Sequence, residues 1–422
     1  MAAPIPGPPT IETNATTIPD SAFARDVVAV MRRLRMSLAA LIASVNGDVT
    51  QPQEMMRQFG LDKNLAWKLS RIVRETEPAA AMPHIPGRPG IGIVLRRFTQ
   101  AGAPEAVVTE ARRAFKAFDE LVETHSGDRE TLEMMLGPLA AERAAQQAEA
   151  HRKLSYRGNS ATWGVQARVQ ISAHLVQPNA DDPSRLDLAI CSGLVGLRRL
   201  REDVPWAIAT VRRFSDDGSV GEGADAEAVD PRFAGVDVPP LLGDFCSDPL
   251  PELRVVPSQP GTTQFELVEG PVGKTAAATC VTGWFCRSCE NRYRDPSNQY
   301  GEHLVNLHTP VETLVHDLYV HHDIAVQIRP YIAMYSQIPS GPIYPNGGRD
   351  RGRLPLYESL RLLGHPPDTI MPEVPAYGEI IETMMHRLGG DASMYHGFRL
   401  SFRHPPIPAI ALIGYRLPDP PA

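Results

Sequence analysis

Cysteine and histidine side chains in the second half of the chain have a spacing that suits zinc. Cys286 and Cys289 are separated by two residues; His303 follows after thirteen more, and His308 after another four. Thiolate sulfur and imidazole nitrogen are the usual ligands of structural zinc, and this spacing is close to that of a zinc finger. Pro296 interrupts the segment, which favours a second interpretation, a pair of reduced cysteines in a turn. Zinc is the one cofactor that the sequence leaves open.

A second group of metal-ligating residue types lies within residues 316–323. Alternation along an extended strand places His316 and His322 on one face, and Asp317, His321 and Asp323 on the other. Two histidines and a carboxylate are a ligand set for iron or zinc. Because no second strand offers a matching ligand, we interpret these residues as polar positions on a strand surface.

Motifs of the common enzyme classes are absent. Residues 270–275 follow a predicted strand and contain Gly-Lys-Thr, but a phosphate-binding loop needs a glycine at position 268, where the chain has Val268. The chain also lacks His-Glu-x-x-His, Gly-x-Ser-x-Gly and the dinucleotide-binding glycine pattern. We therefore assign no catalytic residue, and the sequence favours a protein that is not an enzyme.

Residues 61–74 have the spacing of a helix with one apolar and one polar face. Leu61, Leu65, Leu69 and Ile72 recur at steps of three and four residues. The opposite face carries Asn64, Trp67, Lys68 and Arg71. Asparagine can pair with adenine and arginine with guanine in the DNA major groove, whereas lysine suits phosphate. Trp67 has an alternative place in the core or in a subunit contact.

The segment around this helix resembles the helix-turn-helix of bacterial transcriptional regulators. Residues 50–74 contain a short helix, a turn at Gly60 and a second helix that Asp62 can cap. The resemblance is limited to these residues. It implies contacts with double-stranded DNA from the following residues: Asn64, Trp67, Lys68, Arg71, Arg74, Arg32, Arg33 and Arg35.

The charge around this segment differs from that of the whole chain. Residues 21–100 contain twelve basic and six acidic side chains, whereas the 422-residue chain has a net charge of −7. A segment that binds the phosphate backbone has such a local excess of positive charge. The sequence therefore predicts a DNA-binding transcriptional regulator, which we expect to self-associate because operator binders usually act as dimers. Since helix-turn-helix units also serve as packing modules, an interaction or assembly protein is the alternative, followed by a metal-binding protein.

Hydrophobic periodicity divides the chain into two unlike parts. We expect a disordered tail at 1–20, a helical domain at 21–155 with the helix-turn-helix at 50–76, and a β-rich domain at 156–422. The predicted helices start near residue 21 and then cover 51–59, 62–76, 90–101, 104–124 and 128–153. The predicted strands are 165–175, 186–191, 206–213, 263–268, 276–285, 311–321, 398–403 and 409–416.

The order of these elements predicts an α+β fold with mainly antiparallel strands, because few strands are separated by helices. Residues 165–175 alternate strictly, which predicts a half-buried strand with one face in water. Residues 214–260 are acidic and rich in glycine and proline, so we expect a long surface loop. Two short helices are predicted late in the chain, at 355–363 and 378–388.

Composition indicates an ordinary globular protein. The hydrophobic fraction is 43%, and the five cysteines are an odd number at uneven spacing, unlike a secreted disulfide framework. The first residues lack the pattern of a signal peptide, and no apolar run reaches the ~18 residues of a membrane helix. We therefore expect a cytoplasmic protein without a membrane partner.

Overall fold

The computed structural model describes residues 22–75, 77–136, 141–212, 226–235, 238–257, 262–296, 298–337 and 352–421. The chain divides into two compact units, the first ending at Ala148 and the second beginning at Glu149. Helices make up the first unit and antiparallel-rich sheets dominate the second, so the predicted α+β class is confirmed. The predicted tail at 1–20 lies outside the described residues.

The first unit is helical throughout its described length. Its elements are α1 (Ala22–Ala43), α2 (Pro52–Phe59), α3 (Lys63–Arg74), α4 (Pro78–Ala81), η1 (Met82–His84), α5 (Arg88–Gln100), α6 (Glu105–His125) and α7 (Arg129–Leu136). The next helix, α8 (Ala141–Trp163), contains the division between the units. The sequence prediction ended this helix at residue 153; the helix instead continues until Gly164, whose φ of 71° ends it.

Regular apolar spacing explains why these helices share a core. On α1, Val27, Met31, Leu34, Leu38 and Leu41 are all buried, as the periodicity predicts. These five residues belong to one cluster that includes side chains of α2, α3, α5, α6 and α7. The ring centroids of the α2 and α5 phenylalanines at its centre are 4.7 Å apart and stacked.

The second unit is built on a seven-stranded sheet. Its strand order is β11 (Arg361–Gly364), β12 (Tyr395–Arg403), β9 (Val311–His321), β1 (Val165–Pro178), β2 (Arg185–Arg199), β7 (Ala278–Asn291) and β4 (Glu227–Ala228). All neighbouring pairs are antiparallel except β1 with β9, which are parallel with Ala167 opposite Val311. The prediction of mainly antiparallel pairing is confirmed.

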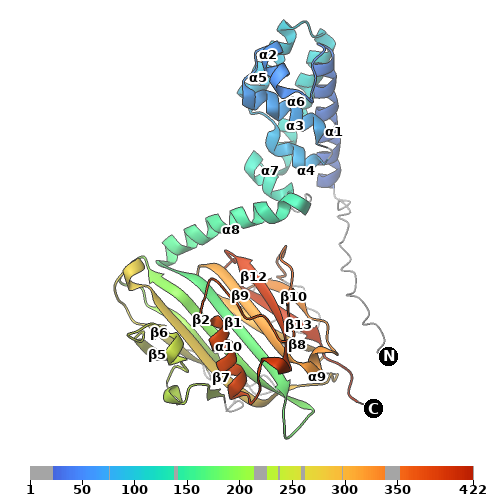
Figure 1. Ribbon diagram of the computed structural model, residues 1–422. Coiled ribbons are helices and arrows are strands. Elements are labelled where there is room, and N and C mark those ends of the chain that lie inside the picture. The colour runs from blue at the N-terminus through green and yellow to red at the C-terminus, as the bar shows by residue number, and fades with distance from the viewer. Residues whose placement is uncertain are drawn as a thin grey trace. The chain divides into compact units, whose positions relative to one another are not determined.

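Both faces of the large sheet are covered. Helix α10 (Tyr377–Arg387) packs its apolar side on one face, where Figure 1 shows it lying across the strands. A three-stranded sheet of β10 (Tyr331–Ser336), β13 (Ala409–Arg416) and β8 (Tyr300–Leu307) shares a core with the other face. The prediction that β1 has one face in water holds for its first half, where Arg168 is exposed, and is wrong for its second half, because Ser172 and His174 are buried.

The segment predicted as an acidic loop at 214–260 contains packed structure in its described part. It includes β4, two short helices η3 (Pro231–Phe233) and η4 (Gly243–Phe245), and β5 (Leu253–Pro257). Val229, Leu241 and Leu242 are buried, so scattered apolar residues anchor this acidic segment to the sheet. Strand β5 forms a third sheet with β6 (Thr262–Leu267) and β3 (Trp206–Arg212), in the order β3-β6-β5.

The late part of the chain differs from its prediction at one helix. The helix predicted at 378–388 is confirmed as α10, but residues 355–360 are not helical and 361–364 form β11. Pairing with β12 explains this difference, since edge-strand hydrogen bonds replace those of a short helix. The remaining short helices are η5 (Lys274–Ala276), α9 (His322–Ala325) and η6 (Ala392–Met394).

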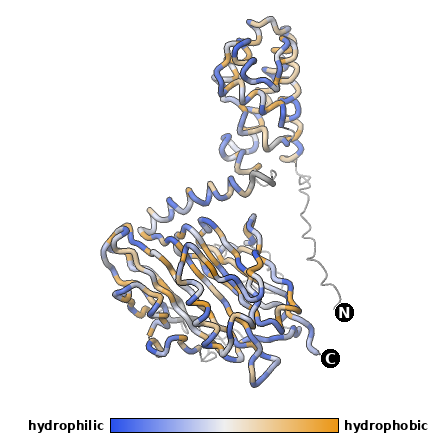
Figure 2. Tube along the Cα trace, viewed as in Figure 1, coloured by the Kyte–Doolittle hydropathy of each residue, from blue (hydrophilic) through white to orange (hydrophobic). Residues whose placement is uncertain are grey.

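Figure 2 shows hydrophobic residues running along the strands, whereas α8 is largely hydrophilic. Within the described part of the chain, no helix has the length and apolar character needed to cross a membrane.

Candidate nucleic-acid interface

The turn between α2 and α3 has the backbone that its sequence predicts. Gly60 lies in the left-handed region with φ 59° and ψ 36°, and its N–H donates to the Met56 carbonyl at the end of α2. The Asp62 carboxylate accepts a hydrogen bond from the Leu65 N–H at 2.9 Å, which caps α3. Glycine tolerates the positive φ and aspartate satisfies an otherwise unpaired N–H, so two local residues determine where the helices end and begin.

The inner face of α3 is held firmly in the helical unit. Leu65, Ala66, Leu69 and Ile72 are buried in the same core as α1. The Ser70 hydroxyl on this side donates to the Val49 carbonyl at 2.5 Å, which ties α3 to the segment before α2. With its inner face held in this way, α3 presents its remaining residues outward in a defined order.

The outer face of α3 is polar except at Trp67. The exposed residues are Lys63, Asn64, Trp67, Arg71 and Arg74, and Lys68 is half-buried between them. The side chains of Lys63, Asn64 and Lys68 make no hydrogen bond or ion pair with the described part of the chain. One ammonium and one carboxamide at the start of the helix, with a second ammonium one turn later, are thus available to a ligand.

Trp67 lies on this outer face, so the alternative that it completes the core is wrong. Its side chain is 42% exposed, and its ring meets the His84 ring edge-on with the centroids 5.0 Å apart. The Arg71 guanidinium lies over the indole, 5.3 Å from the ring centroid. A groove of about 490 Å³ runs beside the indole, lined by Pro52, Gln53, Met56, Lys63, Asn64 and Trp67.

Three arginines gather at the C-terminal end of α3. Arg71 forms an ion pair with Glu75 at 3.2 Å, and Arg35 of α1 donates to the Glu75 backbone carbonyl, also at 3.2 Å. Arg74 precedes Glu75 in the chain and is exposed. Cations at this end of a helix also complement its dipole.

The other two arginines predicted to face phosphate lie on α1. Arg33 forms an ion pair with Glu110 of α6 at 2.8 Å, so it braces two helices. Arg32 is exposed on α1. Of the predicted phosphate contacts, Arg35 and Arg74 are therefore the ones that the fold brings to α3.

The predicted zinc ligands are not assembled. Cys286 and Cys289 lie on β7, and the Cys289 thiol donates to the Cys286 carbonyl at 3.5 Å. His303 lies on β8 with its ring toward His174, and His308 follows β8. In the described parts of the chain, the only group of three or more ligating residues whose donor atoms lie within 4.8 Å is His321, His322 and Asp323. The alternative of a cysteine pair in a turn is also wrong in its placement, because both residues lie within strand β7, where neither forms a disulfide.

The prediction that His316 lies on a strand surface is wrong, because His316 belongs to a cluster of buried histidines that the sequence did not predict. His174 of β1, His303 of β8 and His316 of β9 meet between the two sheets, with ring centroids of His174 5.4 Å from His303 and 5.2 Å from His316. Burial lowers the pKa of all three, that of His303 to about 3, so they are neutral in the fold. Alternation along β1 and β9 placed these side chains on one face, but it carries no sign of the sheet that covers that face.

The chain was compared with protein-family models, with curated proteins and with solved structures. No match was found. The candidate interface is accordingly defined by its own geometry, namely a capped helix held on one side by the core, with amide, ammonium and guanidinium groups along the other. Such a face can donate hydrogen bonds to base edges and to phosphate oxygens.

Proposed function

We propose that this chain binds double-stranded DNA through the outer face of α3 and acts as a transcriptional regulator. The observation that carries the proposal is the position of Asn64 and Lys68, which share the outer face of a helix whose inner face is buried. The major groove admits an α-helix, where the Asn64 carboxamide can bond adenine. The Lys68 ammonium can bind a neighbouring phosphate.

The cluster of arginines supports the same proposal. Arg71 is paired with Glu75, but an exposed pair of this i,i+4 kind contributes only about 0.3–0.5 kcal/mol, so phosphate can compete for the guanidinium. Arg35 donates to the Glu75 carbonyl, and the exposed Arg74 precedes Glu75 in the chain, so both add cations near the end of α3. Their attraction for DNA is electrostatic and independent of base sequence.

The second unit has a separate role in this proposal, sensing a ligand or holding copies of the chain together. Operator binders commonly act as symmetric dimers, because two recognition helices then reach successive half-sites. We therefore propose a homo-oligomer.

Selection of duplexes from a random pool by the full chain tests the assignment of Asn64. We expect enrichment of a motif with an adenine that Asn64→Ala no longer prefers, a change worth about 1–3 kcal/mol at that position. Arg112→Ala is the matched control, because Arg112 is an exposed arginine on α6 of the same unit. A pool that shows no enrichment, or a motif unchanged in Asn64→Ala, would contradict the proposal.

The groove beside Trp67 favours one alternative, a non-enzymatic assembly protein. A 42% exposed indole next to an apolar groove is typical of a protein contact. Under this alternative, Trp67→Ala lowers the mass measured by light scattering, and the parent chain shows no affinity for DNA. Under the DNA-binding proposal, the parent chain binds DNA and Lys68→Ala weakens that binding.

A further inference from the structure

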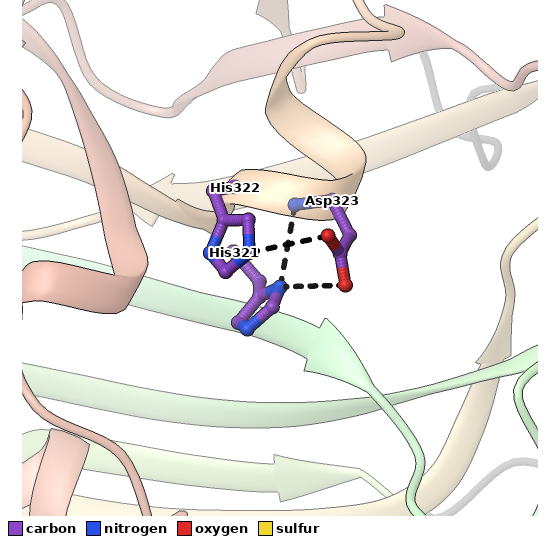
Figure 3. A group of neighbouring side chains, drawn as sticks. All are labelled: His321, His322 and Asp323. Atoms are coloured by element: carbon purple, nitrogen blue, oxygen red, sulfur yellow. Dashed lines mark hydrogen bonds and ion pairs between the residues drawn. The ribbon is translucent and has the colours of Figure 1, made fainter.

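Three side chains converge where strand β9 passes into helix α9. The His322 Nε2 atom lies 3.2 Å from Asp323 Oδ1, and the His321 Nδ1 atom lies 3.6 Å from Asp323 Oδ2. Figure 3 shows both rings turned toward the carboxylate. The three donor atoms lie within 4.8 Å of one another, so one ion can reach all of them after small side-chain rotations.

The hydrogen bonds around the group indicate which ring nitrogens carry a lone pair. The His321 Nδ1 atom accepts the Asp323 N–H at 3.3 Å, so in the neutral ring this nitrogen carries no proton. The His322 Nδ1 atom lies 3.4 Å from the Met394 carbonyl and can donate to it, which leaves Nε2 as an acceptor facing the carboxylate. The His322 Nε2 lone pair and the Asp323 carboxylate then face each other, whereas the His321 Nδ1 lone pair accepts the Asp323 N–H in a long hydrogen bond that a bound ion would replace. A cation held by all three groups removes the unfavourable contact between the two acceptors.

The surroundings favour this arrangement of ligands. His321 is buried, and its ring meets the Tyr395 ring edge-on at 6.1 Å, which restricts its rotation. His322 and Asp323 are about half exposed, so an ion can enter from solvent and open coordination positions remain. The contact from His322 to the Met394 carbonyl is of the kind that orients metal-binding histidines.

We propose that His321, His322 and Asp323 form a binding site for a divalent first-row transition-metal ion. Two imidazoles and one carboxylate suit zinc, nickel, copper and iron better than magnesium or calcium, which prefer all-oxygen ligands. The site lies in the second unit and does not depend on whether α3 binds DNA.

Titration of the full chain with zinc chloride, after removal of any histidine tag, tests the proposal by calorimetry. We expect one ion per chain at this site. His322→Ala and Asp323→Ala should each weaken binding at least tenfold, since each removes one of three ligands. His386→Ala is the matched control, because His386 is an exposed histidine on α10 outside the group, and it should leave the affinity unchanged.

A spectroscopic readout identifies the ligands directly. With one equivalent of Cu²⁺, the electron paramagnetic resonance spectrum should show coupling to two nitrogens in the parent chain and to one in His322→Ala. Circular dichroism confirms that each variant keeps its fold. An absence of stoichiometric zinc binding would overturn the proposal, as would equal affinity in the parent and a folded His322→Ala/Asp323→Ala variant.

Discussion

Asp317 is a fully buried carboxylate that is surrounded by hydrogen-bond donors. Its carboxylate accepts bonds from Arg399 Nε at 2.9 Å and Nη2 at 2.7 Å, from Tyr319 at 2.9 Å and from Tyr377 at 2.6 Å. All four residues are buried. Tyr377 belongs to α10 and the other three belong to the large sheet, so the network ties the covering helix to β9 and β12.

Removal of this carboxylate should be strongly destabilising. In Asp317→Ala the Arg399 guanidinium stays buried without its counter-ion, which costs about 3–5 kcal/mol of unfolding free energy. Urea unfolding monitored by circular dichroism measures the loss. Glu382→Ala, at an exposed acidic residue on α10, should change stability by less than about 0.5 kcal/mol. A loss below about 1 kcal/mol for Asp317→Ala would contradict a structural role for the ion pair.

The buried histidines make stability sensitive to acid. Their folded pKa values lie below the ordinary 6.5, so below that pH the unfolded chain binds more protons than the folded one. The stability of the neutral histidine cluster is fully present above pH 6.5. As the pH falls toward 3, the free energy of unfolding drops by up to about 1.4 kcal/mol per pH unit for each histidine.

Glu290 acts in the opposite direction. Burial raises the pKa of Glu290 from 4.5 to about 7. Its contribution to the free energy of unfolding is therefore present below pH 4.5 and is lost as the pH rises through 7. We expect His303→Asn to reduce the loss of stability between pH 6.5 and 5, and Glu290→Gln to reduce the loss near pH 7. Melting temperatures of the parent and the two variants, measured from about pH 5 to 7, test both expectations. A variant whose melting temperature changes with pH in parallel with the parent would contradict the pKa shift of that residue.

The helix-turn-helix depends on two residues that act on helix ends. Gly60→Ala would place a side chain at φ 59°, which should lower the free energy of unfolding by about 1–2 kcal/mol. The cause is backbone strain and not a collision, because the nearest atom, in Arg97, is 3.6 Å from the added carbon. Asp62→Ala removes the cap of α3, a cost of about 1 kcal/mol. Both should speed amide hydrogen exchange in α3, whereas Arg112→Ala should not. Unchanged exchange in Gly60→Ala would show that the turn tolerates another backbone.

Local signals explain which elements could be predicted from the sequence. The limits of α2 and α3 follow from Gly60, Asp62 and a buried stripe at helical spacing, and the outer face of α3 follows from the same pattern. Strands β9 and β13 were predicted with their observed bounds, because apolar and β-branched residues dominate both. Strand β8 was missed although its inward positions alternate, since glycine and histidine occupy two of them.

Contacts between distant segments could not be predicted. The histidine cluster joins β1, β8 and β9, and its burial depends on a second sheet that no single strand encodes. The helix predicted at 355–363 was wrong for a related reason, because pairing of β11 with β12 determines the structure there. Tertiary context of this kind overrides local propensity.

At the scale of the whole molecule, charge is distributed unevenly. The chain carries a net charge of −7, whereas residues 21–100 have twice as many basic as acidic side chains. Long-range attraction to DNA is therefore weak, and binding should depend on the few cations near α3. We therefore expect the affinity for DNA to fall modestly with salt concentration, through the arginines around Glu75 and through Lys68.

The most direct test of the DNA-binding proposal is fluorescence anisotropy of the full chain with a random-sequence duplex across a salt series. The logarithm of the binding constant should fall linearly with the logarithm of salt concentration. Lys68→Ala should reduce the magnitude of that slope by about 0.9, as expected for one phosphate contact, and Arg112→Ala should leave the slope unchanged. Absence of binding by the folded chain at about 50 mM salt, or equal slopes for the parent and Lys68→Ala, would contradict the assignment of α3 to DNA.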